Sequence, residues 1–172
     1  LLPALESGQI DMAVAGMSVT EDRSKNALFS DSYYVASQQI IVKNESPIRN
    51  KYELVGKSIG VQLGTTGDQM AQKINNSRVV QFPTAPNVLQ ELTSGRVDAA
   101  ILDNAPAAQY VSSYSSLKIL ETPLSRESYA IAMKKGNQDL LDKVNNVISQ
   151  MKEDGRMRKL LMKHFGTTEG QL

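Results

Sequence analysis

The sequence predicts an α/β protein built from two similar lobes. The first observation is a repeat: LPALESGQIDMAVAG at 2–16 is matched by LQELTSGRVDAAILD at 89–103. In each copy, leucines three apart mark one face of a helix, and a glycine suits the left-handed residue that ends it. The short apolar run that follows is typical of a strand buried on both faces. The second observation is that helical and strand patterns alternate along the chain, which favours a parallel or mixed sheet with ligands at the carboxyl ends of its strands.

The individual elements follow from local signals. Thr20 is a suitable N-cap, Gly95 ends a helix, Asp154-Gly155 breaks the terminal helical region, and Gly166 closes it. The expected helices are 1–6, 20–26, 66–74, 86–93, 105–111, 138–152 and 157–164. The expected strands or extended runs are 10–14, 38–43, 57–62, 79–82, 97–102, 117–120 and 129–133.

The order of these elements predicts a discontinuous first lobe and a continuous second lobe. Residues 41–126 contain a complete set of helices and strands, while residues 1–40 and 127–172 would pack together. Two extended segments, near 38–41 and 127–130, would then cross between the lobes. Two such crossovers make a natural hinge.

Composition excludes several classes of function. Among 172 residues, 19 Lys and Arg balance 18 Asp and Glu, so no basic patch for nucleic acid or for a membrane surface is indicated. No apolar run is long enough to span a bilayer. The absence of cysteine excludes disulfides, Cys–metal sites and thiol nucleophiles, and His164 is the only histidine, so we find no metal-binding cluster and no Ser-His or Cys-His pair. We therefore expect no cofactor, no metal and no catalytic residue.

The first candidate binding residue is Arg23. It follows the strand end at Gly16 and Ser18 and lies three residues into the helix that Thr20 caps. A guanidinium is a planar, permanently charged partner for a carboxylate, and nearby backbone N–H groups and the Ser18 hydroxyl would add neutral donors. The alternative is an ordinary helix start with a solvated arginine.

The second candidate is the turn Gln62-Leu63-Gly64-Thr65-Thr66-Gly67-Asp68, which leads from a strand into a helix. Free N–H groups at a helix start favour a carboxylate or a phosphate. The turn is not a P-loop, because it lacks the Gly-Lys-Ser/Thr ending. The alternative is that Thr65 or Thr66 is simply the N-cap.

The third candidate is Asp103, directly after the apolar strand that ends at Leu102. A carboxylate at that position must be paired or hydrated, and a ligand ammonium group is a fitting partner. The alternative is that Asp103 caps the next helix, which has Pro106 in its first turn. Taken together, Arg23 for a carboxylate and Asp103 for an ammonium predict a receptor for an α-amino acid.

These residues resemble the periplasmic or lipid-anchored amino-acid-binding proteins of ABC importers, the polar-amino-acid family known as solute-binding protein family 3. The resembling stretches run in the family's order over nearly the whole chain: LLPALESGQIDMAVAGMSVTEDR, FSDSYY, VGKSIGVQLGTTGDQ, LTSGRVDAAILD and MKEDGRMRKLLMKHFG. The resemblance implies a two-lobed flytrap of type II, similar to other periplasmic binding proteins, with a two-stranded hinge.

The resemblance also implies roles for single residues. Arg23 would clamp the ligand carboxylate, and Asp103 would take the ammonium group. Gln62 would contact the ligand side chain. The remaining implied contacts are the carbonyl, N–H and hydroxyl groups of Ala15, Gly16 and Ser18, and the second-lobe residues Thr65 and Thr66.

The chain departs from the family at its start. The family has a β-α-β segment before the position of LLPAL, so we expect an N-terminally truncated chain with an incomplete first lobe. An apolar strand at 10–14 without its usual neighbour invites self-association or a domain swap.

The function that the resemblance implies is an extracytoplasmic receptor without enzymatic activity. It would bind a polar L-amino acid such as arginine or glutamine in an interlobe cleft and deliver it to the membrane subunits of an ABC permease. Its expected location is periplasmic, or extracellular as a membrane-anchored lipoprotein. Two alternatives remain: a flytrap-fold enzyme similar to cyclohexadienyl or prephenate dehydratase, and the ligand-sensing domain of a receptor.

Overall fold

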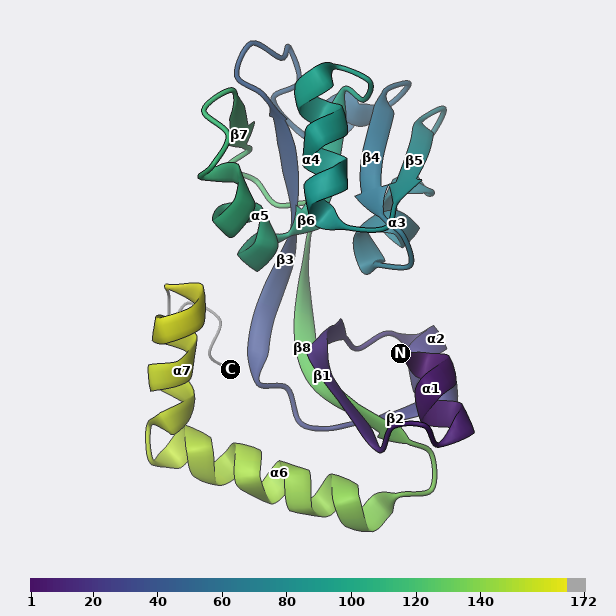
Figure 1. The fold of residues 1–172 in the computed structure, drawn as a ribbon, viewed down its shortest axis with the longest axis vertical. Helices are drawn as coiled ribbons and strands as arrows, with labels where there is room; N and C mark the ends of the chain where they lie inside the picture. The colour runs from purple at the N-terminus through teal and green to yellow at the C-terminus, as the bar shows by residue number, and fades with distance from the viewer. Residues whose placement is uncertain (167–172) are drawn as a thin grey trace. The chain divides into compact units, whose positions relative to one another are not determined.

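The computed structural model describes residues 1–166 (Figure 1). The chain separates into two compact units, which we call unit 1 (Leu1–Ala36 with Glu127–Leu172) and unit 2 (Ser37–Arg126). Two strands continue from one unit into the other along the chain: β3 (Tyr34–Lys43) and β8 (Ser125–Lys134).

Unit 1 combines short strands with helices from both ends of the chain. Strands β1 and β2 each pair antiparallel with β8. The elements that complete unit 1 are α1 (Leu2–Ser7), β1 (Met12–Ser18), α2 (Glu21–Asn26), β2 (Ala27–Phe29), α6 (Gln138–Glu153) and α7 (Arg156–Phe165). Helix α7 follows α6 after Gly155, whose φ of 78° confirms the predicted break.

Unit 2 is a mixed sheet with helices on both faces. Strand β4 lies between β5 and β6 and is parallel to both, whereas β3 pairs antiparallel with β6 and with β7. Its elements are η1 (Lys51–Leu54), β4 (Ser58–Gln62), α3 (Thr66–Ala71), β5 (Arg78–Phe82), α4 (Ala85–Ser94), β6 (Ala99–Asp103), α5 (Asn104–Val111) and β7 (Leu117–Ile119). The predicted α/β class and the mixed sheet are confirmed.

The two faces of this sheet explain the apolar strands of unit 2. Along β6, alternate residues enter different cores, because side chains alternate between the faces of a strand. Ala99 and Ile101 pack on the face covered by α3, and Ala100 and Leu102 pack on the face covered by α4 and α5. Close packing of α4 also accounts for Gly60 in β4, where a Cβ atom would lie 3.0 Å from Cγ1 of Val88.

The sequence repeat corresponds to one helix–glycine–strand unit in each half of the fold. Helix α1 ends at Gly8 with a φ of 75°, and α4 ends at Gly95 with a φ of 81°, as predicted. The strands differ, however. The first four residues of β6 are buried, but Met12 and Val14 of β1 are 46% and 64% exposed. The prediction that both copies are buried on both faces is therefore wrong for β1.

Strand β1 also lies further along the chain than predicted, starting at Met12 instead of at Ile10. Ile10 belongs to the connection after α1 and packs in the small cluster around Leu5. Among residues 1–166, β1 is the last strand at its end of the sheet, and its exposed side chains Met12 and Val14 line an apolar groove. An end strand has a sheet neighbour on one side only.

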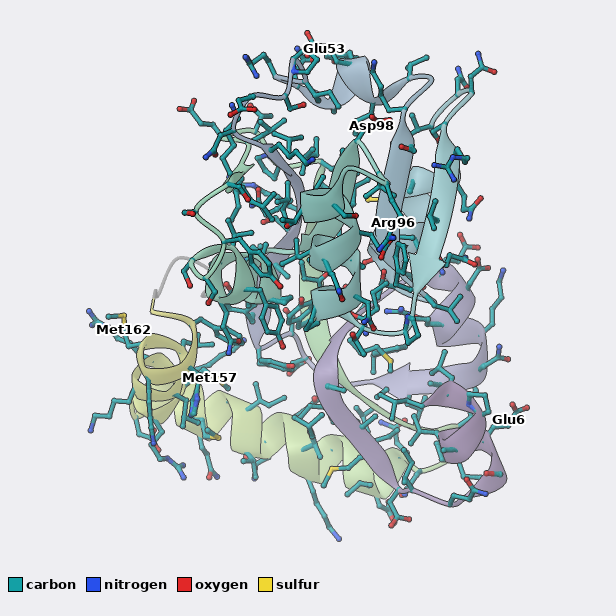
Figure 2. The ribbon with its side chains drawn as sticks, turned by 45° about the horizontal axis from the view of Figure 1, so that its top comes forward. Glu6, Glu53, Arg96, Asp98, Met157 and Met162 are labelled. Atoms are coloured by element: carbon teal, nitrogen blue, oxygen red, sulfur yellow. The ribbon has the colours of Figure 1, made fainter. Side chains whose placement is uncertain are left out.

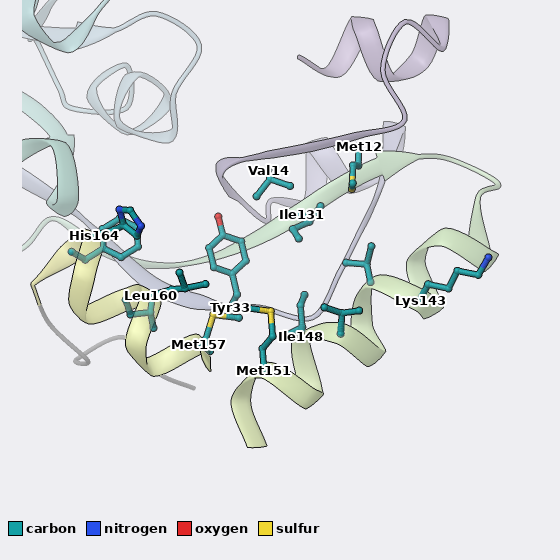
Figure 3. A pocket seen from close by; sticks show the side chains of 14 residues that line it. Met12, Val14, Tyr33, Ile131, Lys143, Ile148, Met151, Met157, Leu160 and His164 are labelled. Carbon is teal, nitrogen blue, oxygen red and sulfur yellow. The ribbon is translucent and has the colours of Figure 1, made fainter. Parts of the chain in front are cut away.

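Next to β1, an apolar groove of about 680 Å³ lies within unit 1 (Figure 3). Its lining comes from β1, from β8, from Tyr33 just before β3, and from α6 and α7. The main lining residues are Val14, Tyr33, Ile131, Ile148, Leu160 and Leu161. This groove and the exposed side of β1 form one continuous apolar surface, which we call the β1 groove.

Candidate functional site

The residues predicted in unit 1 gather where β1 ends and α2 begins. Thr20 has extended backbone angles, and its side chain accepts a hydrogen bond of 3.2 Å from the backbone N–H of Arg23, so the predicted N-cap is confirmed. The guanidinium of Arg23 turns back and donates to the carbonyl oxygen of Ser18 at 2.8 Å. Arg23 is half-buried against the strand end, which argues against a fully solvated arginine.

Ser18 is buried at the end of β1, and its hydroxyl donates to Oε2 of Glu127 on β8 at 2.5 Å. A serine hydroxyl has a single proton, so this bond leaves Ser18 to act toward a ligand as an acceptor. The sequence did not indicate Glu127. It lies 109 residues from Ser18, and only the antiparallel pairing of β1 with β8 brings the two together.

Gly16 lies in an irregular part of β1, because the pairing register with β8 shifts between Ala13 and Met17. Such a bulge re-aims the chain locally. Gly16 has a φ of 56°, and a Cβ atom there would lie 3.1 Å from Cε2 of Tyr129. Burial raises the pKa of the Tyr33 phenol, and a hydrogen bond from the Gly16 backbone opposes that rise. Ala15, next to Gly16 in the bulge, is exposed.

In unit 2, the side-chain hydroxyl of Thr65 holds the turn between β4 and α3 in place. Thr65 accepts a hydrogen bond of 3.2 Å from the N–H of Asp68 and donates one of 2.8 Å to the carbonyl oxygen of Gln62. Thr65 is thus the N-cap of α3, as the alternative prediction stated. The amide of Gln62 donates to the carbonyl oxygen of Pro83 at 3.4 Å, and Thr66 is buried.

Asp68 also stabilises this turn, although the sequence indicated no separate role for it. Its carboxylate is buried and accepts from the Gly64 N–H at 3.0 Å, from the Gln81 amide at 2.8 and 3.0 Å, and from the Gln72 amide at 3.3 Å. These donors replace the water that a buried carboxylate loses. Asp68 therefore fixes the shape of the Gly-Thr-Thr-Gly turn.

Asp103 occupies the N-cap position of α5, yet its side chain makes no capping hydrogen bond in the described structure. The N-cap side chain normally accepts from the second or third N–H of the helix, and here the third residue is Pro106, which has no N–H. The amide of Gln38 donates to Oδ1 of Asp103 instead. Asp103 therefore stands at the N-cap, as the alternative prediction stated, but its side chain does not supply the capping hydrogen bond.

The structure thus brings the predicted residues together in two separate sets. Arg23 lies with Ser18 in unit 1, and Thr66 lies with Asp103 in unit 2. The link in unit 2 is Gln38, whose amide also donates to the Thr66 hydroxyl at 3.0 Å. The sequence contained a signal for Gln38, a polar residue among alternating buried positions of a strand, but no indication of its partners.

Residues 1–166 contain no group of three or more His, Asp or Glu side chains placed to hold a metal ion. Within the same range, every helix is too short or too polar to cross a membrane.

Three proteins to which this chain is similar are named as amino-acid-binding or cystine-binding proteins. L-cystine-binding protein TcyJ of Escherichia coli (strain K12) is 33% identical over 170 residues, which are 96% of this chain and 64% of TcyJ. An ancestral arginine-binding protein, solved with glutamine bound, is 44% identical with a TM-score of 0.90, over 96% of this chain and 76% of that one. AncCDT-1, an ancestral amino-acid-binding protein and a precursor of cyclohexadienyl dehydratase, is 35% identical with a TM-score of 0.87, over 95% and 72%.

The chain therefore spans a little under two thirds of the length of TcyJ. The sequence model of the bacterial extracellular solute-binding proteins, family 3, matches residues 1–167, which is nearly the full chain. The fold of the described residues agrees with solved amino-acid-binding proteins over almost the same extent. The chain belongs to family 3 of the bacterial extracellular solute-binding proteins.

Proposed function

We propose that this chain binds a polar L-amino acid as part of an extracytoplasmic receptor that supplies an ABC permease. The support comes from three sources: the family, the amino-acid ligands named for its relatives, and two charged side chains suited to the two ends of an amino acid. In this proposal each unit contributes one of those side chains, Arg23 from unit 1 and Asp103 from unit 2.

Arg23 is the proposed partner of the ligand carboxylate. Its backbone N–H bonds to Thr20 and its guanidinium to the carbonyl of Ser18, so the side chain is held before any ligand arrives. Ordering a long side chain in advance reduces the entropy that binding must cost. A hydrogen bond to a charged group contributes about 1.5–3 kcal/mol.

Asp103 is the proposed partner of the ligand ammonium group, and its placement is the observation that carries the proposal. An aspartate at an N-cap position usually bonds to its own helix. Pro106 removes one of the two usual donors, and the carboxylate of Asp103 is bonded by Gln38, from a strand 65 residues away. An acceptor held away from its helix is suited to a ligand with several N–H donors.

The other predicted residues would complete the contacts with neutral groups. Ser18 would accept from the ligand, because its proton goes to Glu127. The remaining proposed contacts are Ala15, Gly16, Gln62, Thr65 and Thr66. Micromolar affinity corresponds to about 8 kcal/mol, which a few charge-assisted bonds and a buried aliphatic stem can supply.

Arginine and glutamine are the ligands we propose to test first. The solved ancestral relative is named arginine-binding and has glutamine bound. TcyJ is named for cystine, so the family alone does not select the side chain. We further propose a location outside the cytoplasmic membrane, either in a periplasm or as a lipoprotein, with the permease subunits as the partner.

A thermal-shift screen of the common amino acids tests this function, because a ligand that binds the native state raises Tm by mass action. Calorimetric titration of each amino acid that shifts Tm then gives its affinity. We expect a polar amino acid to bind with a stoichiometry near one. The absence of any shift or heat with every amino acid would reject the proposal.

An enzyme is the second candidate, since AncCDT-1 is described as a precursor of cyclohexadienyl dehydratase. Dehydration needs an acid and a base beside the substrate, beyond the groups of a receptor. We propose that this chain is not an enzyme. Incubation with prephenate followed by product analysis separates the two candidates, and turnover above the uncatalysed rate would favour the enzyme.

A further inference from the structure

Gln38 is a polar side chain in the interior of unit 2, with an exposed fraction of 0%. On β3, alternate residues point to the same side, and the neighbours of Gln38 on that side are the buried Ala36 and Ile40. An apolar side chain would fit this pattern without cost, whereas a buried amide costs free energy unless it is hydrogen-bonded. The partners of this amide therefore indicate why a glutamine is present.

Both partners of the amide nitrogen are residues of the proposed ligand site. Gln38 lies directly opposite Asp103 in the pairing of β3 with β6, and its amide donates to Oδ1 of that residue and to Oγ1 of Thr66. The carboxylate of Asp103 can only accept, so it requires the NH₂ group on that side, because a reversed amide would place its oxygen against the carboxylate. These contacts therefore determine the orientation of the amide.

The opposite end of the amide shows that the arrangement is not optimised for stability. The oxygen Oε1 is buried and has no hydrogen-bond partner among residues 1–166. It lies against Gly67, where a Cβ atom would be 2.6 Å from Oε1. A buried acceptor without a partner is unfavourable, so Gln38 orients Asp103 and Thr66 at a cost to the fold.

Asp68 provides an instructive contrast within unit 2. Its buried carboxylate receives donors from Gly64, Gln72 and Gln81 and holds a turn together. The hydrogen bonds that the Asp68 carboxylate accepts all serve to hold this turn and its neighbouring strand and helix. The donors of Gln38, in contrast, point to a carboxylate that does not cap its helix and to a threonine beside it.

We propose that Gln38 is a positioning residue for ligand binding: it holds the Asp103 carboxylate and the Thr66 hydroxyl in the orientation that receives the ligand. This inference rests on the proposed function. Gln38 acts through Asp103 and Thr66, without itself contacting the ligand. Gly67 is part of the same device, because only a residue without a Cβ leaves room for the amide.

The test uses calorimetric titration with arginine and with glutamine on the wild type and on four variants. Gln38→Met keeps the length of the side chain and removes the donor, and we expect affinity to fall about tenfold or more. The matched control is Gln39→Met, whose amide donates to the Ser37 hydroxyl, and its affinity should stay unchanged. Asp103→Asn and the double variant Gln38→Met/Asp103→Asn complete a double-mutant cycle, which measures the coupling between the two side chains. If Gln38 acts through Asp103, the double variant should bind little worse than Asp103→Asn alone.

Gln38→Glu adds a second measurement, the pH dependence of ligand affinity, which a purely structural role of Gln38 would not change. At acidic pH the introduced carboxyl group is protonated and can donate its O–H to Asp103, so affinity should return toward the wild-type value. As pH rises, the introduced carboxyl group ionises against Asp103, and two adjacent carboxylates repel, so affinity should fall. Wild-type affinity measured over the same range is the reference, and circular dichroism at each pH verifies that the variant is folded.

The outcomes separate this inference from the proposed function. If the wild type binds an amino acid and Gln38→Met binds equally well, the inference is wrong and the function stands. If Gln38→Glu shows no gain at acidic pH relative to the wild type, the inference is also wrong. If the wild type binds no amino acid, the proposed function fails, and the inference fails with it.

Discussion

Arg23 donates a hydrogen bond of 2.8 Å from its guanidinium to the backbone carbonyl of Ser18, five residues earlier in the chain. The bond spans the turn between β1 and α2 and holds the cation at the end of the strand. Thr20 holds the backbone of the same residue through its hydroxyl. The position of the positive charge is therefore set by the fold of unit 1.

This relationship predicts that Arg23→Ala weakens amino-acid binding by at least about 2 kcal/mol, because a charge-assisted contact with the ligand carboxylate is lost. Calorimetry on the variant measures the loss. Lys25→Ala is the matched control, since Lys25 lies on the same helix and pairs with the exposed Asp22. An affinity of Arg23→Ala equal to that of the control would remove Arg23 from the proposed site.

A second prediction concerns Asp103→Asn. The side-chain oxygen of asparagine can still accept the hydrogen bond from Gln38, and no capping bond is lost, so Tm of the ligand-free protein should change little. Without the negative charge, binding of the ligand ammonium should weaken by about tenfold or more, or about 1.4 kcal/mol. Differential scanning calorimetry and titration give the two values. A large drop in Tm with unchanged affinity would instead assign Asp103 a structural role.

Gly16 and Gly56 allow backbone strain to be separated from steric contact. Both glycines have a positive φ, but a Cβ atom at Gly16 would meet the Tyr129 ring at 3.1 Å, while one at Gly56 would meet nothing within 4 Å. Gly56→Ala should cost about 1 kcal/mol of unfolding free energy from strain alone. Gly16→Ala should cost more, about 2 kcal/mol, because the ring must also move. Urea denaturation compares the two, and equal losses would contradict the contact.

The sequence predicted those parts of the fold that depend on neighbouring residues. Gly8 and Gly95 end their helices, and Thr20 and Thr65 begin theirs, because each effect acts within one turn of the chain. The exposure of β1 could not be predicted in this way, since it depends on which strands lie beside it. The repeated motif therefore corresponds to one buried strand, β6, and one partly exposed strand, β1.

The candidate site shows the same limit. The sequence indicated a role for Asp103, but Gln38, which donates to its carboxylate, lies 65 residues away. Glu127, bonded to Ser18, is still more distant along the chain. These contacts form only when distant strands pair. The partners of Asp103 and Ser18 therefore could not be predicted without knowing that β3 pairs with β6 and that β1 pairs with β8.

Asp98, labelled in Figure 2, gives a prediction about pH. The backbone N–H and the hydroxyl of Ser58 donate to its carboxylate at 2.8 and 2.7 Å, and these bonds lower its pKa below the ordinary value. A lowered pKa in the folded state means that the stabilisation is present at neutral pH and is lost as pH falls through that pKa. Asp98→Asn should therefore lower Tm slightly at neutral pH, with a difference that shrinks on acidification. A difference that stays constant across the range would show that charge is not involved.

The β1 groove predicts self-association of this chain. Strand β1 is the last strand at its end of the sheet, and Val14 on it is 64% exposed beside an apolar groove. Two identical end strands can pair antiparallel about a two-fold axis, and the apolar surface beside each strand would favour that association. A net charge of +1 opposes this association only weakly. We therefore expect a second copy of the chain to occupy the surface.

Sedimentation velocity over a range of protein concentrations measures this association. Val14→Lys places a charge on the exposed side of β1 and should shift the protein toward the monomer, because burying that charge in a dimer is unfavourable. Val55→Lys is the matched control, since Val55 is 51% exposed, belongs to unit 2 and is not among the residues that line the groove. If the wild type sediments as a monomer at every concentration, or if both variants change association equally, β1 is not the contact surface.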